Sequence, residues 1–153
     1  DDDEIARRIR RFYVPYDEAI REALSTFRAA HIRPIILSIH SFTPFWRGTP
    51  RPWHAGILWA KDGRLSHALI AALRTDPALV VGDNEPYHGA LTGDVIDRHA
   101  LAHGYSNTLI EIRQDLIATD DTARAWGKKL GDVLTPLLAD PLHRLDFRSS
   151  TGS

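Results

Sequence analysis

The sequence predicts an α/β domain with a mostly parallel or mixed sheet and helices on both faces. Short β-branched runs alternate along the chain with longer segments of helical periodicity. Of the 153 residues, 43% are hydrophobic and 25% are charged, which is ordinary globular composition. A chain of this length can bury an independent core. We therefore expect a single α/β domain over residues 1–148, followed by a flexible tail over residues 149–153.

The first third of the chain predicts two helices and one strand. Apolar side chains recur at helical spacing over residues 3–30, interrupted at Pro15, which predicts a break at residues 14–16. The run 35–39 is aliphatic and β-branched, as in a buried strand, and it ends at His40. A loop rich in glycine, proline and arginine follows over residues 45–52.

The remainder continues the alternation. Its pattern predicts strands at 54–60, 79–81 and 108–112, and helices at 65–73, 94–103 and 122–138. Gly104 is placed to end the second of these helices. Ligand sites in α/β sheets collect at the carboxyl ends of strands. We therefore expect His40, the polar loop 82–87 and residues 113–115 near one rim.

Composition excludes several classes of function. There is no cysteine, so disulfides, thiolate metal sites and cysteine nucleophiles are ruled out. The formal charge of −1 indicates no general attraction to nucleic acid or to an acidic membrane, and no stretch is apolar enough to span one. The expectation is a cytoplasmic protein. Because the sequence lacks methionine even at position 1, we also expect it to be a processed product or a fragment of a longer protein.

His40 is the most informative single residue. It follows an aliphatic run and precedes Ser41. A neutral imidazole at a strand end can ligate zinc through one nitrogen while the other is held by an acceptor. A capping role, or a buried histidine bonded to the backbone, remains the alternative. No second histidine lies within four residues to form a local zinc motif.

Glu111 is the second candidate because its neighbours in the predicted strand are apolar. An acid in a central strand is costly unless paired, and desolvation raises a carboxyl pKa toward the range of a general base. The alternative is a salt bridge with Arg113, which points to the same face of the strand.

Other residues are weaker candidates. The guanidinium groups of Arg47, Arg51 and Arg113 match the geometry of a carboxylate, although loop arginines are commonly surface groups. Asn84 and Tyr87 could orient a polar substrate. His99 and His103 have the spacing of paired zinc ligands, but no glutamate lies between them.

Four segments, in order and with matching spacing, resemble the N-formylglutamate amidohydrolase family, and the similarity runs from about Arg8 to Leu138. They are His-Ser-Phe-Thr-Pro at 40–44, Arg-Pro-Trp-His-Ala-Gly at 51–56, Gly-Asp-Asn-Glu-Pro-Tyr at 82–87, and Glu-Ile-Arg-Gln-Asp-Leu at 111–116. Members of the family are zinc hydrolases related in fold to carboxypeptidases. They cleave the amide of N-formylglutamate or of a similar N-acyl amino acid.

The resemblance implies roles for particular residues. It makes His40 a zinc ligand and Glu111 the general base. Arg51 and Arg113 would bind substrate carboxylates, Asn84 and Tyr87 would line the pocket, and His99 would contact the substrate or support the site. One departure is Asp17, which stands where relatives often have histidine.

The family's first metal motif has no counterpart in this sequence, although a catalytic zinc takes three protein ligands. We therefore expect the other zinc ligands outside this chain, which would be the C-terminal portion of an incomplete hydrolase-like fold. The competing hypotheses are a non-catalytic or degenerate α/β binding module around Arg51 and Arg113, and an enzyme for another N-acyl amino acid or a small peptide. The sequence predicts no oligomeric state.

Overall fold

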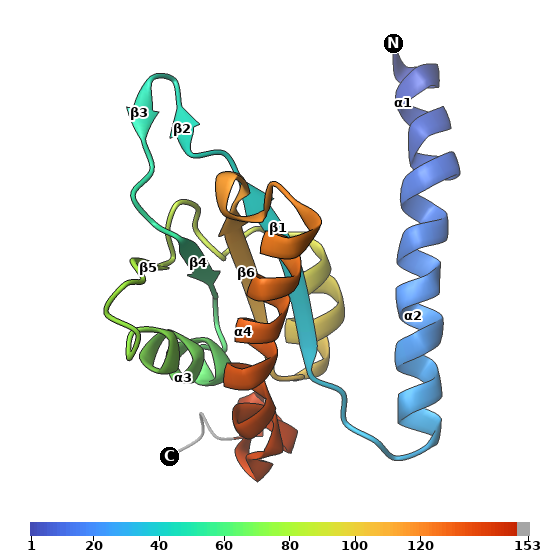
Figure 1. Cartoon of the computed structure of the whole chain (residues 1–153). Coiled ribbons are helices and arrows are strands. Elements are labelled where there is room, and N and C mark those ends of the chain that lie inside the picture. Colours follow the sequence, from blue (N-terminus) through green and yellow to red (C-terminus); the bar gives the residue numbers. More distant parts are fainter. Residues whose placement is uncertain (150–153) are drawn as a thin grey trace. The chain divides into compact units, whose positions relative to one another are not determined.

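The computed structural model describes residues 1–149, which form two compact units, one over Asp1–Pro34 and one beginning at Ile35. We predicted one domain over 1–148. The α/β architecture belongs to the second unit (Figure 1). Of the predicted tail, all but the backbone of Ser149 lies outside the described residues.

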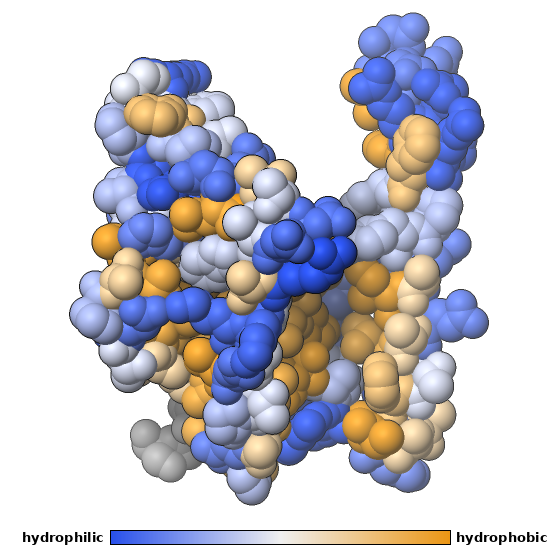
Figure 2. All heavy atoms as spheres, in the orientation of Figure 1, coloured by the Kyte–Doolittle hydropathy of each residue, from blue (hydrophilic) through white to orange (hydrophobic). Residues whose placement is uncertain are grey.

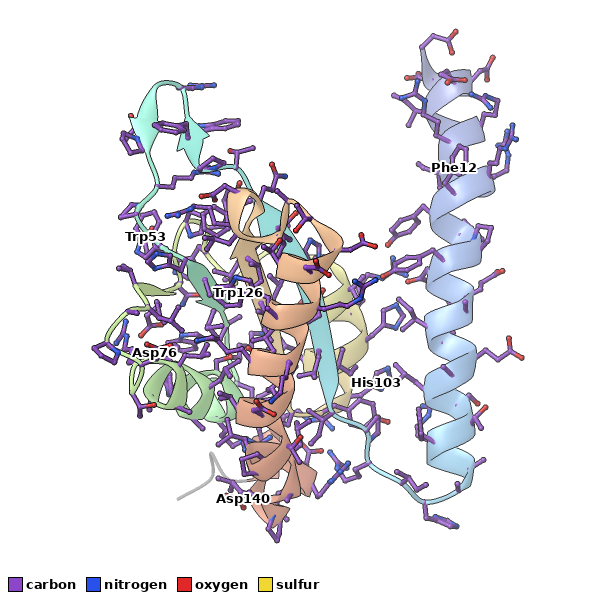
Figure 3. All side chains as sticks on the ribbon, in the orientation of Figure 1. Phe12, Trp53, Asp76, His103, Trp126 and Asp140 are labelled. Carbon is purple, nitrogen blue, oxygen red and sulfur yellow. The ribbon has the colours of Figure 1, made fainter. Side chains whose placement is uncertain are left out.

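The first unit is one continuous helix built from three segments: α1 (Asp2–Arg8), η1 (Ile9–Tyr13) and α2 (Val14–Ala29). The predicted break at residues 14–16 was therefore wrong. Pro15 occupies the first turn of α2, where its missing N–H costs little, and a π-helical turn precedes it. Hydrophobic and hydrophilic residues both reach the surface of this helix, and Phe12 is 61% exposed (Figures 2 and 3).

The sheet of the second unit has the strand order β1-β6-β4-β5. β1–β6 and β4–β5 are parallel pairs and β4–β6 is antiparallel, so the predicted mixed sheet is confirmed. In the described residues β1 has a strand neighbour on one side only. The strands are β1 (Ile36–Phe42), β4 (Ala55–Leu58), β5 (Val81–Asp83) and β6 (Asn107–Arg113).

Helices cover both faces of this sheet, as predicted (Figure 1). On one face, α3 (Arg64–Leu73) and α4 (Asp120–Ala139) pack against Ile110 and Ile112 of β6. On the other face, η2 (Ile96–Ala100) and η3 (Leu101–His103) pack against Leu109. This division follows from the alternation of side chains along β6. Gly104 follows η3 and ends it with a φ angle of 69°, as expected of a glycine that terminates a helix.

Three local features differ from the prediction. β5 begins at Val81 and not at residue 79, and it includes the first two residues of the predicted loop 82–87. β1 continues through His40 to Phe42, so His40 lies within the strand and not at its end. The predicted loop 45–52 contains a small hairpin, β2 (Phe45–Trp46) paired with β3 (Thr49–Pro50). Arg47 and Gly48 form its turn with positive φ angles, which suits a two-residue hairpin connection.

The chain after β6 is fixed to the sheet domain at several points. η4 (Gln114–Ile117) leads into α4, which Thr119 caps through Thr122. Trp126 of α4 packs on the core (Figure 3). Lys129 forms an ion pair with Asp76, with Nζ 2.6 Å from the carboxylate. Two short turns follow, η5 (Pro141–Arg144) and η6 (Phe147–Ser149). No helix among residues 1–149 combines the length and apolar character needed to cross a membrane.

His143 makes the stability of this C-terminal region depend on pH. It is 3% exposed, and its Nδ1 lies 3.2 Å from Ser106 Oγ. Burial lowers the pKa of His143 below its ordinary value of 6.5, and the neighbouring charge of Asp140 opposes this only in part. The folded state therefore binds the proton more weakly than the unfolded chain, so stability is lost as the pH falls below about 6.5.

We expect the free energy of unfolding to fall by on the order of 1 kcal/mol between pH 7 and pH 5 through this group. His143→Gln should remove that part of the slope, whereas His31→Asn, at an exposed position with φ 56°, should leave it unchanged. Urea unfolding at both pH values measures the slopes. An unchanged slope in His143→Gln would show that other groups control acid stability.

Candidate functional site

His40 and Glu111 are direct neighbours across the parallel strands β1 and β6. Their Cα atoms are register partners, and neighbouring strands lie about 4.8 Å apart. Both side chains share one face of the sheet with Ser38 and Leu109, two residues earlier. The two strongest candidates from the sequence are thus brought together by strand pairing, although they lie far apart in the chain.

Glu111 is a buried carboxyl group with an unused acceptor. The residue is 6% exposed, and its Oε2 has no hydrogen-bond partner among the described residues. Burial raises the pKa of Glu111 above its ordinary value of 4.5, while the positive charges of His40 and Arg51 act in the opposite direction. A carboxyl group with a raised pKa and a free oxygen is suited to accept a proton near neutral pH.

His40 is exposed, and its Nε2 lies 3.0 Å from Ser38 Oγ. One contact of this kind leaves Nδ1 available for another partner. No group of three histidine or acidic side chains within residues 1–149 could hold a metal ion. The donors present therefore do not form a complete zinc site, and His40 provides a single imidazole.

Arg51 is held in a cage of aromatic rings beside this pair. It is 8% exposed, and its guanidinium lies 5.0–5.8 Å from the ring centres of Phe42, Trp46 and Tyr87. Nη1 donates to Tyr87 Oη at 3.0 Å and to Thr43 Oγ1 at 3.2 Å. Within residues 1–149, Nε and Nη2 of Arg51 donate to no other group, so part of the guanidinium remains available to a carboxylate.

The other predicted arginine has a different environment. Arg113 donates from Nε and Nη2 to Asp115, and from Nη1 to the carbonyl oxygens of residues 51–53 at 3.3 Å each. All three of its side-chain nitrogens are thereby engaged, and Nη1 holds the loop that carries Arg51. The salt bridge considered for Glu111 is made instead by Asp115, whose pKa this contact lowers.

Asn84 also holds a loop in place. Its Oδ1 accepts from the backbone N–H groups of Trp59, at 2.9 Å, and Gly89, at 3.1 Å. These bonds fix the segment 84–89 against the end of β4 and so position Tyr87. His99 is buried in η2 and is not among the residues that line the pocket. The ring of His103 stacks on Tyr105, with their centres 5.6 Å apart.

A pocket of about 290 Å³ opens beside the His40–Glu111 pair. Sequence reasoning did not single out Ser38, His88 or Asp94, which belong to its wall. His88 and Asp94 come from the segment 88–94, whose sequence reads as an ordinary loop and carries no motif of a binding site. The wall consists of Ser38, His40, Leu58, Tyr87, His88, Gly89, Leu91, Asp94, Val95, Ile96, Leu109 and Glu111.

The chain matches a known protein family and is similar to a solved crystal structure. Residues 1–118 match the family described as N-formylglutamate amidohydrolase. The crystal structure of a gene product from Agrobacterium tumefaciens, Atu2144, is similar to the chain with a TM-score of 0.81 and 33% sequence identity over 90% of the chain. The chain corresponds to 56% of the length of that protein. No protein with curated annotation matches significantly.

Proposed function

Because the chain belongs to the N-formylglutamate amidohydrolase family, we propose that it supplies the general base and the carboxylate-binding arginine of an enzyme that hydrolyses the amide of an N-acyl amino acid. The family supports a hydrolase acting on a small amide. The register pair of exposed His40 and buried Glu111 carries the proposal for this chain.

In this proposal Glu111 takes the proton of the attacking water. Removal of that proton allows the water oxygen to bond to the acyl carbon. The carboxyl group then passes the proton to the amide nitrogen, the C–N bond breaks, and an acid and a free amino acid are released. The free Oε2 atom and the raised pKa of Glu111 support this role, because a free oxygen can accept the proton and a raised pKa makes the carboxylate a stronger base.

Arg51 would hold the carboxylate of the substrate while this transfer takes place. Two oxygens of a carboxylate match the planar fork of a guanidinium. The aromatic cage and the bond to Tyr87 restrict the side chain to one position, which reduces the entropy lost on binding. A substrate anchored there is fixed relative to Glu111, and such positioning lowers the barrier.

A catalytic zinc ion requires more protein ligands than residues 1–149 bring together. We propose that His40 is one ligand and that the others come from polypeptide outside this sequence, since residues 1–149 contain no cluster of three ligands. Isothermal titration of zinc into the chain alone should therefore show weak binding that His40→Ala reduces further. Tight stoichiometric binding would contradict this assignment of ligands.

The second candidate is a non-catalytic binding module, which the incomplete set of metal ligands favours. It would keep the anion site at Arg51 and hydrolyse nothing. Incubating the full-length gene product with N-formylglutamate and other N-acyl amino acids, and measuring release of the primary amine, separates the two. Binding without turnover supports the module, whereas turnover that depends on Glu111 supports the enzyme.

We expect Arg51→Lys to raise the KM of the full-length gene product for N-acyl amino acids by ten- to a hundredfold, about 1.4–2.7 kcal/mol. Lysine keeps the charge but loses the planar fork that matches two oxygens. Steady-state kinetics with the substrate carboxylate free or esterified measures the effect, which should be absent for the ester.

Arg47→Lys is the matched control for this substitution. Arg47 lies in the turn of the neighbouring hairpin, with its guanidinium 5.6 Å from the ring centre of Trp46, and it is exposed. The same chemical change there should leave KM within twofold of the original protein. Equal effects of the two substitutions would assign the carboxylate contact to general surface charge and not to Arg51.

A further inference from the structure

The pocket beside Glu111 is built for an apolar group, and this bears on which amide the protein hydrolyses. We propose that it receives an apolar substituent of an N-acyl amino acid, larger than a formyl group, and that it disfavours the acidic side chain of N-formylglutamate. This inference rests on the proposed function.

The inner wall of the pocket is aliphatic. Leu58 of β4 and Leu109 of β6 are register partners and form its floor, and Ile96 of η2 faces them. Leu58 and Ile96 are each 4% exposed, so their positions are fixed by the core. Val95 and Leu91 continue the apolar surface toward the opening. A substrate group that enters past Glu111 thus meets hydrocarbon on several sides, as is usual for the specificity part of a ligand site.

The charges of the wall oppose an anionic substituent. Besides the Tyr87 phenol, its ionisable groups are His40, His88, Asp94 and Glu111, with no lysine or arginine among the lining residues. Asp94 is fixed by accepting from the backbone N–H of Asp97 at 2.7 Å. A second carboxylate of the substrate would therefore approach two acidic side chains in a partly desolvated space, which is unfavourable.

Arg51 borders one end of the pocket, where its Nη1 donates to the hydroxyl of Tyr87, and the aliphatic wall lies toward the other end. Phe42, whose ring contacts Arg51, is two residues beyond His40 toward the carboxyl end of β1. Ser38 and Leu109, which line the pocket, are two residues before His40 and Glu111. An amide placed at Glu111 with its carboxylate at Arg51 would direct another substituent into the apolar pocket.

The size of the pocket indicates a group of several carbons. An apolar cavity of about 150 Å³ is sufficient for benzene, and this pocket holds about 290 Å³. A formyl group contributes a single carbon and would leave most of that space to water. Two substituents fit the same chemistry, namely an apolar amino-acid side chain and an apolar acyl chain.

The test compares three substrates of the full-length gene product: N-formylglutamate, N-formylleucine and N-hexanoylglutamate. We expect kcat/KM for at least one of the last two to exceed that for N-formylglutamate by tenfold or more. A preference for N-formylleucine assigns the pocket to the side chain, and a preference for N-hexanoylglutamate assigns it to the acyl group.

Leu91→Lys provides an independent test. Leu91 is 65% exposed at the opening, so an ammonium group there should not disturb folding. We expect the ratio of kcat/KM for N-formylglutamate to that for the preferred apolar substrate to rise at least fivefold. The matched control is Leu145→Lys, at a residue that is 57% exposed and outside the pocket, and it should leave the ratio unchanged.

The inference fails separately from the proposed function. If N-formylglutamate is the best substrate and Leu91→Lys does not alter the ratio, the apolar assignment is overturned while Glu111-dependent hydrolysis stands. If none of the three compounds is hydrolysed, the proposed function fails. Calorimetric titration with the same compounds then tests whether the pocket prefers an apolar substituent. Tighter binding of either apolar compound supports the inference, and tighter binding of N-formylglutamate overturns it.

Discussion

Glu111→Gln should lower the rate of amide hydrolysis by the full-length gene product by about 10²–10⁴-fold, the usual contribution of a positioned general base. Glutamine has nearly the same shape but cannot accept the proton of the attacking water. Because Glu111 and His40 are paired through the strands and not through their side chains, the sheet should form normally. Single-turnover rates with saturating substrate measure the change, and KM should move much less than kcat.

Glu111→Gln should also change the free energy of unfolding, and the raised pKa of Glu111 determines the sign of that change. A carboxyl whose folded pKa lies above its unfolded value of 4.5 binds its proton more tightly in the folded state. The original protein therefore loses stability as the pH rises through that raised pKa, and Glu111→Gln does not. We expect the variant to be the more stable of the two at pH 7, with the difference shrinking toward pH 4.

Glu18→Gln is the matched control for both readouts, since Glu18 is an exposed acid on α2. It should leave kcat and the pH dependence of unfolding unchanged. Near-normal hydrolysis by Glu111→Gln would remove Glu111 from the mechanism. A loss of rate together with a loss of stability at pH 7 would instead indicate a structural role.

Periodicity was sufficient to predict the type of element where apolar residues form a continuous run or recur at helical spacing. The aliphatic runs that became β1, β4 and β6, and the amphipathic pattern of α4, gave the correct element types and the mixed sheet. Periodicity was insufficient where polar residues continue a strand. β1 extends past His40 through exposed Ser41 to buried Phe42, and the two polar residues interrupt the hydrophobic pattern that would identify this part as strand.

The candidate site was likewise predictable from the sequence only in part. The chemical character of His40, Glu111 and Arg51 is visible in the sequence, but their proximity depends on strand register and on a loop that returns to the sheet. Arg113 and Asn84 have the residue types of substrate-binding groups, and the structure shows what sequence cannot, that their hydrogen-bonding atoms hold neighbouring loops. The acidic and apolar lining of the pocket likewise arises from β4, β6, η2 and the segment before η2.

Gly56→Ala should cause a large loss of stability. Gly56 is buried in β4, opposite Glu111, and a Cβ atom at this position would overlap the backbone carbonyl oxygen of Glu85. The neighbouring Gly82 approaches the same carbonyl, so the loop has little room to move away. We expect a cost of about 3 kcal/mol, at the upper end for overpacking because a backbone atom must shift. Tm should fall by roughly 10 °C.

The displacement should also reach the site, because Glu85 lies between Asn84 and Tyr87 in the loop that supports Arg51 through the Tyr87 hydroxyl. Gly56→Ala should therefore raise KM while leaving the Glu111-dependent step comparatively intact. Gly127→Ala is the matched control: a Cβ there meets no atom within 4 Å, and alanine in the middle of α4 should stabilise the chain by about 0.5–1 kcal/mol. Thermal unfolding followed by circular dichroism compares the two. Equal Tm values would mean that the loop 84–89 yields without cost, and the close packing that positions Tyr87 would then not be what orders the site.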